Sequence, residues 1–272
     1  MAELPLDVVV AGPLGAGKTT LVRRLARQAR ALSTAISISI EELGDAGIDL
    51  AALGDEGYRT AGGGGTQLWQ ITEIASHEPL GDVWNRRPSP SPSRRLVVVV
   101  DASRFDAHYA RDCWRLAMAS ADCVLLNKCD TRFEAEISGL AETVRRLAPG
   151  AAVIPTVEST VTWDELLAAH RDGAVRTFAA PPEIGHLFCE LERPLVRRTL
   201  ERFISDPPAG VERAKGFVQI EGEPETWSVQ ITGRSGALRK AFLSVPQKPR
   251  IALAGAPGGI ALRAAVERLL EK

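Results

Sequence analysis

The stretch LDVVVAGPLGAGKTTLVRRL, residues 6–25, decides the fold of this chain. Residues 6–12 form a short, valine-rich run that ends in glycine, which is typical of a buried strand. Residues 12–19 fit the pattern G-x-x-x-x-G-K-[ST], and residues 19–32 carry apolar side chains near helical spacing. A strand before the pattern and a helix after it are the context in which it predicts a phosphate-binding loop.

The residue types of this loop suit a phosphate chain. Glycines let backbone N–H groups converge on the β-phosphate, and the N-terminus of the following helix adds its dipole. Lys18 would reach the β- and γ-phosphates, Thr19 would ligate Mg²⁺ and Thr20 would lie near the α-phosphate. An ordinary glycine-rich turn is the alternative, which the flanking elements disfavour. The predicted nucleotide contacts are Gly12, Leu14, Gly15, Ala16, Gly17, Lys18, Thr19 and Thr20.

A second motif, Asn127-Lys128-Cys129-Asp130, predicts which base is bound. The Asp130 carboxylate accepts from guanine N1–H and the 2-amino group together, a donor pair that adenine lacks. Asn127 would contact the other edge of the base and brace the phosphate loop, and the Lys128 stem would lie over the base. By itself the motif is equally typical of a loop with a helix-capping aspartate. After a strand, and with a phosphate loop in the same chain, it favours GTP.

Carboxylates for Mg²⁺ have two candidate sources. The apolar run 96–101 ends in Asp101, which would hold the metal through water or, as readily, cap the next helix. Residues 41–49, EELGDAGID, form either a switch loop that reaches the metal or a solvated turn. Within them Glu42 is the candidate to orient water or metal, by position only. Lys18 and Glu42 are therefore the expected catalytic residues.

Strand and helix patterns alternate from residue 5 to about 176, which predicts a parallel α/β sheet flanked by helices. The Pro/Ser-rich residues 86–95 read as a flexible insert, and AAPPE at 179–183 reads as a linker. Beyond it, helices and strands form a small α+β unit. We expect a P-loop GTP-binding domain at 1–178 and an α+β domain at 183–272. The elements expected in the second domain are helices at 191–205 and 259–272 and strands at 213–222, 225–233 and 250–256.

The amino-acid composition limits the classes of function that the chain can have. The chain has 272 residues, 45% hydrophobic and 25% charged, which is ordinary for a globular protein. A net charge of −1 gives no overall field toward nucleic acid or an anionic membrane, and no apolar run approaches a membrane span. The N-terminus does not read as a signal peptide. The four cysteines have no paired spacing, so a reducing cytoplasm is the expected setting.

These motifs resemble the CobW-type GTPases, which are relatives of the HypB and UreG metal-insertion GTPases. Residues 8–25 look like the family's P-loop, and 41–49 resemble its N-E-F-G-E-x-G-I-D segment. VVVVDA and SADCVLLNKCD are similar to its central strand and base-recognition loop, and residues 211–233 resemble the start of its C-terminal domain. The resemblance implies GTP and Mg²⁺ binding in the first domain and a client metalloprotein engaged through the second.

Two departures from the family pattern stand out. Where the family carries a G-C-x-C-C metal motif, residues 62–66 read Gly-Gly-Gly-Gly-Thr, so no thiolate site is expected there. The spacing His186-x-x-Cys189 suits a metal, but two ligands make a poor site. The family also has an E-T-T-G-like segment on a strand before VVDA. Between Gly65 and Leu96 we find no apolar strand that ends in an acid and a glycine.

Three further readings compete with a CobW-like GTPase. A nucleotide-binding switch or scaffold with weak catalysis fits the apparent lack of the E-T-T-G segment. A metal chaperone that uses the carboxylates of 41–49 in place of thiolates is another reading. A small-molecule kinase is the alternative enzyme, which the NKCD motif disfavours because it predicts GTP over ATP.

Overall fold

The structure is a computed structural model that describes residues 6–40, 69–76, 78–86, 93–169, 176–180, 183–241 and 248–271. These residues fall into two compact units, 6–180 and 183–271. The predictions for the acidic segment 41–49 and the glycine run 62–65 concern residues outside the described ranges. In the described part of the chain, no helix is long and apolar enough to cross a membrane.

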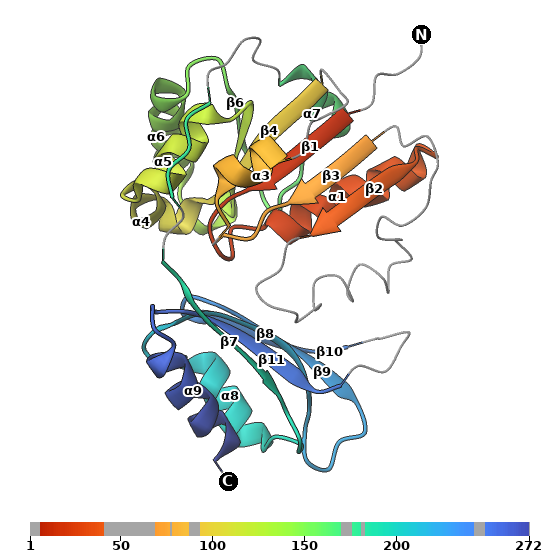
Figure 1. The fold of residues 1–272 in the computed structure, drawn as a ribbon, viewed down its shortest axis with the longest axis vertical. Helices are drawn as coiled ribbons and strands as arrows, with labels where there is room; N and C mark the ends of the chain where they lie inside the picture. The colour runs from red at the N-terminus through yellow and green to blue at the C-terminus, as the bar shows by residue number, and fades with distance from the viewer. Residues whose placement is uncertain are drawn as a thin grey trace. The chain divides into compact units, whose positions relative to one another are not determined.

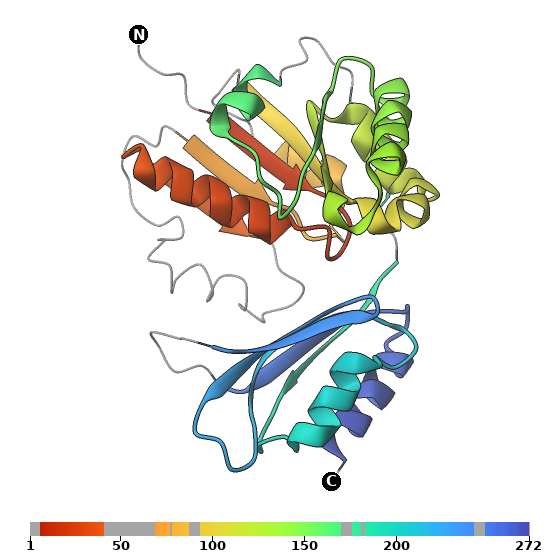
Figure 2. The same ribbon diagram turned by 180° about the vertical axis from the view of Figure 1, so that it is seen from behind.

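The first unit is a six-stranded, fully parallel sheet with strand order β2-β3-β1-β4-β5-β6. Helices α3 to α6 cover one face of this sheet, and α1 and α7 lie on the other (Figures 1 and 2). The strands are β1 (Leu6–Ala11), β2 (Ile36–Ile40), β3 (Trp69–Glu73), β4 (Ser93–Asp101), β5 (Cys123–Asn127) and β6 (Ala152–Pro155). The helices are α1 (Lys18–Ala31), α3 (Leu80–Arg86), α4 (Phe105–Tyr109), α5 (Asp112–Ser120), α6 (Glu134–Leu147) and α7 (Trp163–Ala168), with 3₁₀ turns η2 (Ala102–Arg104) and η3 (Cys129–Thr131).

Both faces of the sheet are buried, which explains the near-continuous apolar runs of its central strands. In β4, every residue from Leu96 to Val100 is fully buried. Alternate residues of β4 contribute to a core with α3, α4, α5 and α6. Because all strands run parallel, their carboxyl ends meet at one edge of the sheet. That edge carries the loops after β1, β3, β4 and β5, where ligands of open α/β sheets bind.

A strand that ends in an acid does lie between Gly65 and Leu96, although its sequence is not uniformly apolar and no glycine follows the acid, so the pattern sought in the sequence did not reveal it. β3 occupies this interval, lies between β2 and β1, and ends at Glu73. Its sequence WQITE contains Gln70 and Thr72, so an apolar pattern does not reveal it, although Thr72 and Glu73 are buried. The insert expected at 86–95 is also too long, since β4 begins at Ser93.

The second unit is a five-stranded antiparallel sheet with strand order β10-β9-β8-β11-β7, and helices α8 and α9 pack on one of its faces (Figures 1 and 2). Pro194 precedes α8 and is not part of the helix. Leu195 forms a β-bridge with Ile220, so the helix begins only at Arg197. Strands β7 and β10 were not expected from the sequence. The elements are β7 (Gly185–Glu190), α8 (Arg197–Ser205), β8 (Val211–Gln219), β9 (Thr226–Thr232), β10 (Ser235–Lys240), β11 (Arg250–Gly255) and α9 (Ile260–Leu270).

Candidate functional site

The loop between β1 and α1 requires glycine at specific positions. Gly12, Gly15 and Gly17 have φ values of 146°, 74° and 112°, a region that other residues rarely adopt. A Cβ on Gly12 would lie 2.2 Å from the Val99 carbonyl oxygen, and one on Gly17 would lie 2.3 Å from Asn127 Nδ2. The loop therefore runs directly against β4 and β5, and both contacts exclude any larger residue.

The N-terminus of α1 is built to receive an anion. Gly17 is the N-cap and supplies no side-chain bond, and the first turn contains no acidic residue. The first N–H groups of a helix have no intrahelical acceptors, and the helix dipole places partial positive charge there. In many proteins a phosphate occupies this position after a glycine-rich loop. Thr20, expected near the α-phosphate, is exposed in this first turn.

Lys18 is buried beneath the loop. Its Nζ donates to the carbonyl oxygens of Gly12 at 2.8 Å and Pro13 at 3.2 Å, and to Ser76 Oγ at 2.8 Å. Ser76 Oγ in turn donates to the Gly12 oxygen at 2.9 Å. The ammonium is thus fixed at the mouth of the loop by the segment that follows β3. Ser76 was not predicted from the sequence, because nothing in its local pattern links it to the loop.

Thr19 faces the acid that ends β3. Its Oγ1 donates to Glu73 Oε1 at 2.9 Å, and Glu73 is only 5% exposed. The parallel pairing of β1 with β3 sets Val10 opposite Glu73, which brings the carboxylate to the phosphate loop. Glu73-Ile74-Ala75-Ser76 therefore stands where the E-T-T-G-like segment was sought and not found. Serine replaces the glycine of that pattern.

Asp101, the other candidate for Mg²⁺, lies on β4, on the opposite side of β1 from β3. Its Oδ2 is 2.6 Å from Lys128 Nζ, and its Oδ1 accepts from Ser103 N at 2.9 Å and Ser103 Oγ at 2.5 Å. The structure brings this carboxylate to the NKCD loop, whereas Glu73 is the carboxylate that contacts Thr19. The alternative expectation, that Asp101 caps the element after its strand, describes its bonds to Ser103.

Asn127 braces the phosphate loop, as the sequence predicted. The side chain is 2% exposed; its Nδ2 donates to the Ala16 oxygen at 2.7 Å, and its Oδ1 accepts from Ser159 N at 2.7 Å. Lys128 has a left-handed backbone, with φ 62°, and Asp130 is exposed in η3. An exposed carboxylate at this edge is accessible to a base.

A loop after β6, which was not predicted from the sequence, completes this edge of the sheet. Glu158 and Ser159 have φ values of 51° and 56°. Ser159 Oγ donates to the Gly17 oxygen at 3.1 Å, and Arg24 of α1 donates to the Glu158 backbone oxygen and carboxylate, both at 2.7 Å. Two non-glycine residues with positive φ are costly, and such strain is concentrated at functional sites. No sequence pattern at these residues indicated it.

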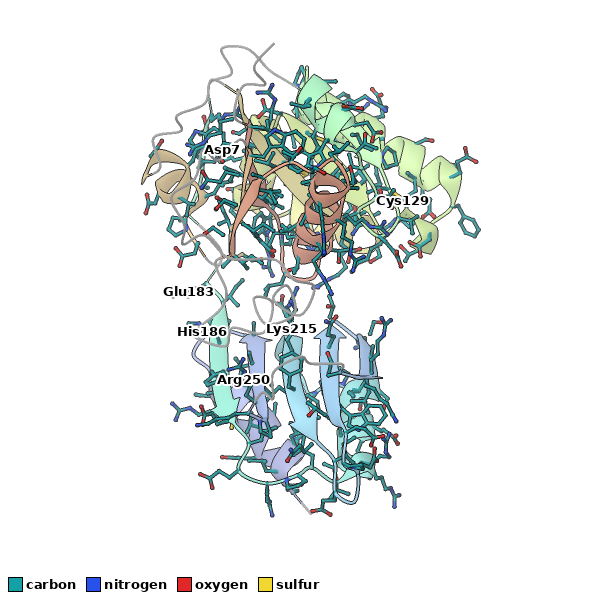
Figure 3. All side chains as sticks on the ribbon, turned by 90° about the vertical axis from the view of Figure 1, so that its right-hand side faces the viewer. Asp7, Cys129, Glu183, His186, Lys215 and Arg250 are labelled. Carbon is teal, nitrogen blue, oxygen red and sulfur yellow. The ribbon has the colours of Figure 1, made fainter. Side chains whose placement is uncertain are left out.

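The described residues hold no cluster of His, Cys, Asp and Glu that would bind a transition metal. All four cysteines are free. Burial raises the pKa of Cys113, Cys129 and Cys189, and raises that of Cys123 to about 12. His186, labelled in Figure 3, is exposed on β7, whereas Cys189 packs against the core of the second unit. Residues three apart in a strand point to opposite faces, so this pair does not form a metal site.

Comparison with known proteins divides the chain in the same way. Residues 6–75 match the model of the CobW/HypB/UreG nucleotide-binding domain, and residues 184–266 match the cobalamin synthesis protein cobW C-terminal domain. No curated protein matches. Among solved structures, the Zn(II)-bound YjiA GTPase from E. coli is 20% identical, with 98% of this chain and 99% of that chain covered and a TM-score of 0.43. HypB from Helicobacter pylori, in complex with nickel, is 15% identical over 58% of this chain and 81% of that chain, with a TM-score of 0.39.

Proposed function

Because the chain belongs to the CobW/HypB/UreG family of nucleotide-binding proteins, we propose that it binds GTP with Mg²⁺ and hydrolyses GTP. The observation that carries the proposal is the convergence of three strand ends on one edge of the parallel sheet. The phosphate loop after β1, Glu73 at the end of β3 and the NKCD loop after β5 lie together there. Phosphate, metal and base each have residues of suitable chemistry.

The residues present fit both ligands. The glycine backbone and the uncapped start of α1 suit the phosphates, with Lys18 as the cation. Thr19 Oγ1 and Glu73 offer a hydroxyl and a carboxylate, the hard oxygen donors that Mg²⁺ prefers beside substrate phosphates. Mg²⁺ would neutralise charge that develops on the phosphates. Glu73 thus replaces Asp101 as our candidate for holding the metal.

Catalysis in such a site consists of positioning and charge neutralisation, with no covalent intermediate on the protein. A phosphate oxygen that accepts from Lys18 competes with Ser76 Oγ and the loop carbonyls, so Ser76 sets how readily the lysine transfers to the substrate. Asn127 holds the phosphate loop against the base loop and so couples the two ends of the nucleotide. Glu42, in the undescribed segment, remains our candidate to orient water.

GTP is proposed over ATP because Asp130 offers a carboxylate to the donor pair of guanine. We further propose a cytosolic role, in keeping with four free cysteines, and a client metalloprotein that engages the second unit. The carboxylate at Thr19 favours an active GTPase over the alternative of a switch without turnover.

Turnover of GTP by wild type and Lys18→Ala tests the proposal. We expect Mg²⁺-dependent phosphate release by wild type and a loss of about 100-fold or more in the variant, since one electrostatic donor to a transition state is typically worth that much. Labelled GDP should be displaced by GTP and not by ATP. Equal background rates in both proteins would refute the proposed GTP hydrolysis. Displacement of labelled GDP by ATP would refute the proposed selectivity for guanine.

A further inference from the structure

The backbone of Lys128 is held in an uncommon conformation. Its φ of 62° and ψ of 37° lie in the left-handed region, which is unfavourable for a non-glycine residue. Such a conformation persists only where the surroundings enforce it. It directs the side chain back along the end of the sheet, where Asp101 meets its ammonium group at 2.6 Å.

Asp101 is a rigid partner for this lysine. Its side chain is 1% exposed, whereas that of Lys128 is 33% exposed. Its second oxygen is fixed by Ser103 N and Oγ, so the carboxylate cannot rotate without losing both bonds. Asp101 and Asn127 are register partners at the ends of β4 and β5, which places this carboxylate immediately beside the base loop.

Arg132 makes a second connection between the same two turns. Its NH2 donates to the Ser103 carbonyl oxygen at 3.4 Å and lies 3.9 Å from Asp106 Oδ2. The loop that carries Lys128 and Asp130 is thus fastened on its β4 side by Asp101 and Arg132. On its other side, Cys129 N donates to the Thr156 oxygen at 3.1 Å. The metal and phosphate contacts proposed above involve neither Asp101 nor its ion pair with Lys128.

We propose that Asp101 is a positioning residue for base recognition, in place of the metal-binding role expected from the sequence. It holds the Lys128 ammonium so that the aliphatic stem forms a fixed platform for the guanine ring beside Asp130. The ring then binds a surface that is already ordered, which lowers the entropy lost on binding. This inference rests on the proposed function, because it assigns the platform to the same guanine nucleotide.

Three variants isolate the pair. Asp101→Asn keeps an oxygen for Ser103 and removes the charge; Lys128→Met keeps an aliphatic stem and removes the ammonium; the third combines both. Asp7→Asn is the matched control, since Asp7 is a buried carboxylate, 2.7 Å from Arg94, at the amino end of β1. Figure 3 labels Asp7 and Cys129, which lie apart in the first unit.

The measurements are the Kd of fluorescently labelled GDP, its displacement by inorganic pyrophosphate, and kcat at saturating GTP over a Mg²⁺ series. We expect Asp101→Asn to bind GDP about tenfold more weakly, the scale of a partly buried charge pair. The double variant should bind no more weakly than Lys128→Met alone, because the two side chains act as one unit. Pyrophosphate affinity and the Mg²⁺ midpoint of Asp101→Asn should stay at wild-type values, as should all GDP measurements on Asp7→Asn.

Each outcome separates this inference from the proposed function. Wild-type GDP affinity in Asp101→Asn would overturn the inference and leave GTP binding intact. A loss of kcat with a raised Mg²⁺ midpoint and weaker pyrophosphate binding would instead restore the metal role of Asp101, and so would also overturn it. If wild type binds pyrophosphate but no GDP, the proposed function fails at the base. Thermal unfolding of each variant shows whether it is misfolded. A misfolded variant would lose pyrophosphate binding together with GDP binding.

Discussion

The Thr19 hydroxyl donates to Glu73 Oε1 over 2.9 Å, so the first turn of α1 is bonded directly to the end of β3. This contact joins a residue of the phosphate loop to a carboxylate 54 positions further along the chain. In the proposed Mg²⁺ site, Glu73 would supply the second protein oxygen, a role for which the sequence had offered Asp101 on another strand.

Glu73→Gln tests that site. The amide keeps an oxygen for Thr19 but removes the negative charge that a divalent cation needs. We therefore expect kcat for GTP to fall about 100-fold, the usual cost of losing one electrostatic group at a reacting phosphate. The Kd of labelled GDP without Mg²⁺ should change little. The control Glu134→Gln alters an exposed acid in the first turn of α6 and should retain wild-type turnover. Unchanged kcat in Glu73→Gln would remove Glu73 from the metal site.

The reasons for the missed strand are physical. The phosphate loop was predictable because glycine, lysine and threonine at fixed spacing have few other uses, and β4 was predictable because both of its faces are buried. β3 is also an interior strand, yet Gln70, Thr72 and Glu73 give it a polar pattern. Thr72 and Glu73 are buried at the functional edge, so the requirements of the site mask the apolar signal of the strand.

The loop after β6 could not be predicted from the sequence for a different reason. Ser159 acts through its backbone N–H to Asn127 and through a strained φ, neither of which depends on a recognisable side-chain pattern. Ser76 likewise reaches Lys18 from 58 positions away. Contacts between residues this far apart in the sequence depend on the order of the strands in the sheet, which the sequence alone did not specify. The pairing of Asp101 with Lys128 was missed for the same reason.

Asn127→Ala tests the brace between the two loops. The change leaves the buried Ala16 oxygen and Ser159 N–H without their side-chain partner. Since an unsatisfied buried group costs about 1–3 kcal/mol, we expect the free energy of unfolding to fall by about 2 kcal/mol or more. GDP affinity should fall as well. Urea unfolding gives the first value. Ser159→Ala is the control, since it keeps the backbone N–H bond to Asn127 and should lose less than half as much. Equal losses in the two variants would mean that the amide does not brace the loops.

Asp130→Asn tests base selection. A carboxylate accepts from both guanine donors, whereas an amide offers one acceptor and one donor. Xanthine carries an oxygen in place of the 2-amino group, so the variant should bind xanthosine diphosphate better than GDP and wild type should show the reverse order. Competition of both nucleotides against a labelled one measures this. A preference for GDP that survives the substitution would show that Asp130 does not contact the base.

The sequence Gly-Gly-Gly-Gly-Thr at 62–66 predicts weak binding of soft metals. The four cysteines have raised pKa values, and metal binding needs deprotonated thiolates. Calorimetric titration with Zn²⁺ should therefore show no site tighter than about 0.1 mM, the range of weak carboxylate sites. The triple variant Gly63→Cys, Gly65→Cys, Thr66→Cys restores G-C-x-C-C and should gain tight binding. Tight binding by wild type that is lost in Gly63→Ala or Gly65→Ala would contradict the prediction.

The buried side chain of His108 should make the stability of the protein depend on pH. His108 in α4 is a buried residue, 5% exposed, and its Nδ1 has no hydrogen-bond partner among the described residues. The pKa of His108 is lowered to about 4, mainly by burial and also by the charges of Arg104, Arg111 and Lys128, while the charge of Asp101 opposes them. The folded protein therefore keeps this imidazole neutral at a pH where the unfolded chain protonates it.

The sign follows from this lowered pKa. Above the unfolded value of about 6.5 neither state binds the proton, so the full stability is present. As pH falls from about 6.5 toward 4, the unfolded chain takes up the proton first and the free energy of unfolding decreases, by roughly 3 kcal/mol in total. His108→Gln removes this contribution, while all other titrating groups are shared with wild type. Urea unfolding at intervals from pH 7.5 to 4 should thus give a wild-type stability that falls more steeply than that of the variant. Parallel curves for the two proteins would show that His108 is protonated as readily in the fold as in the unfolded chain.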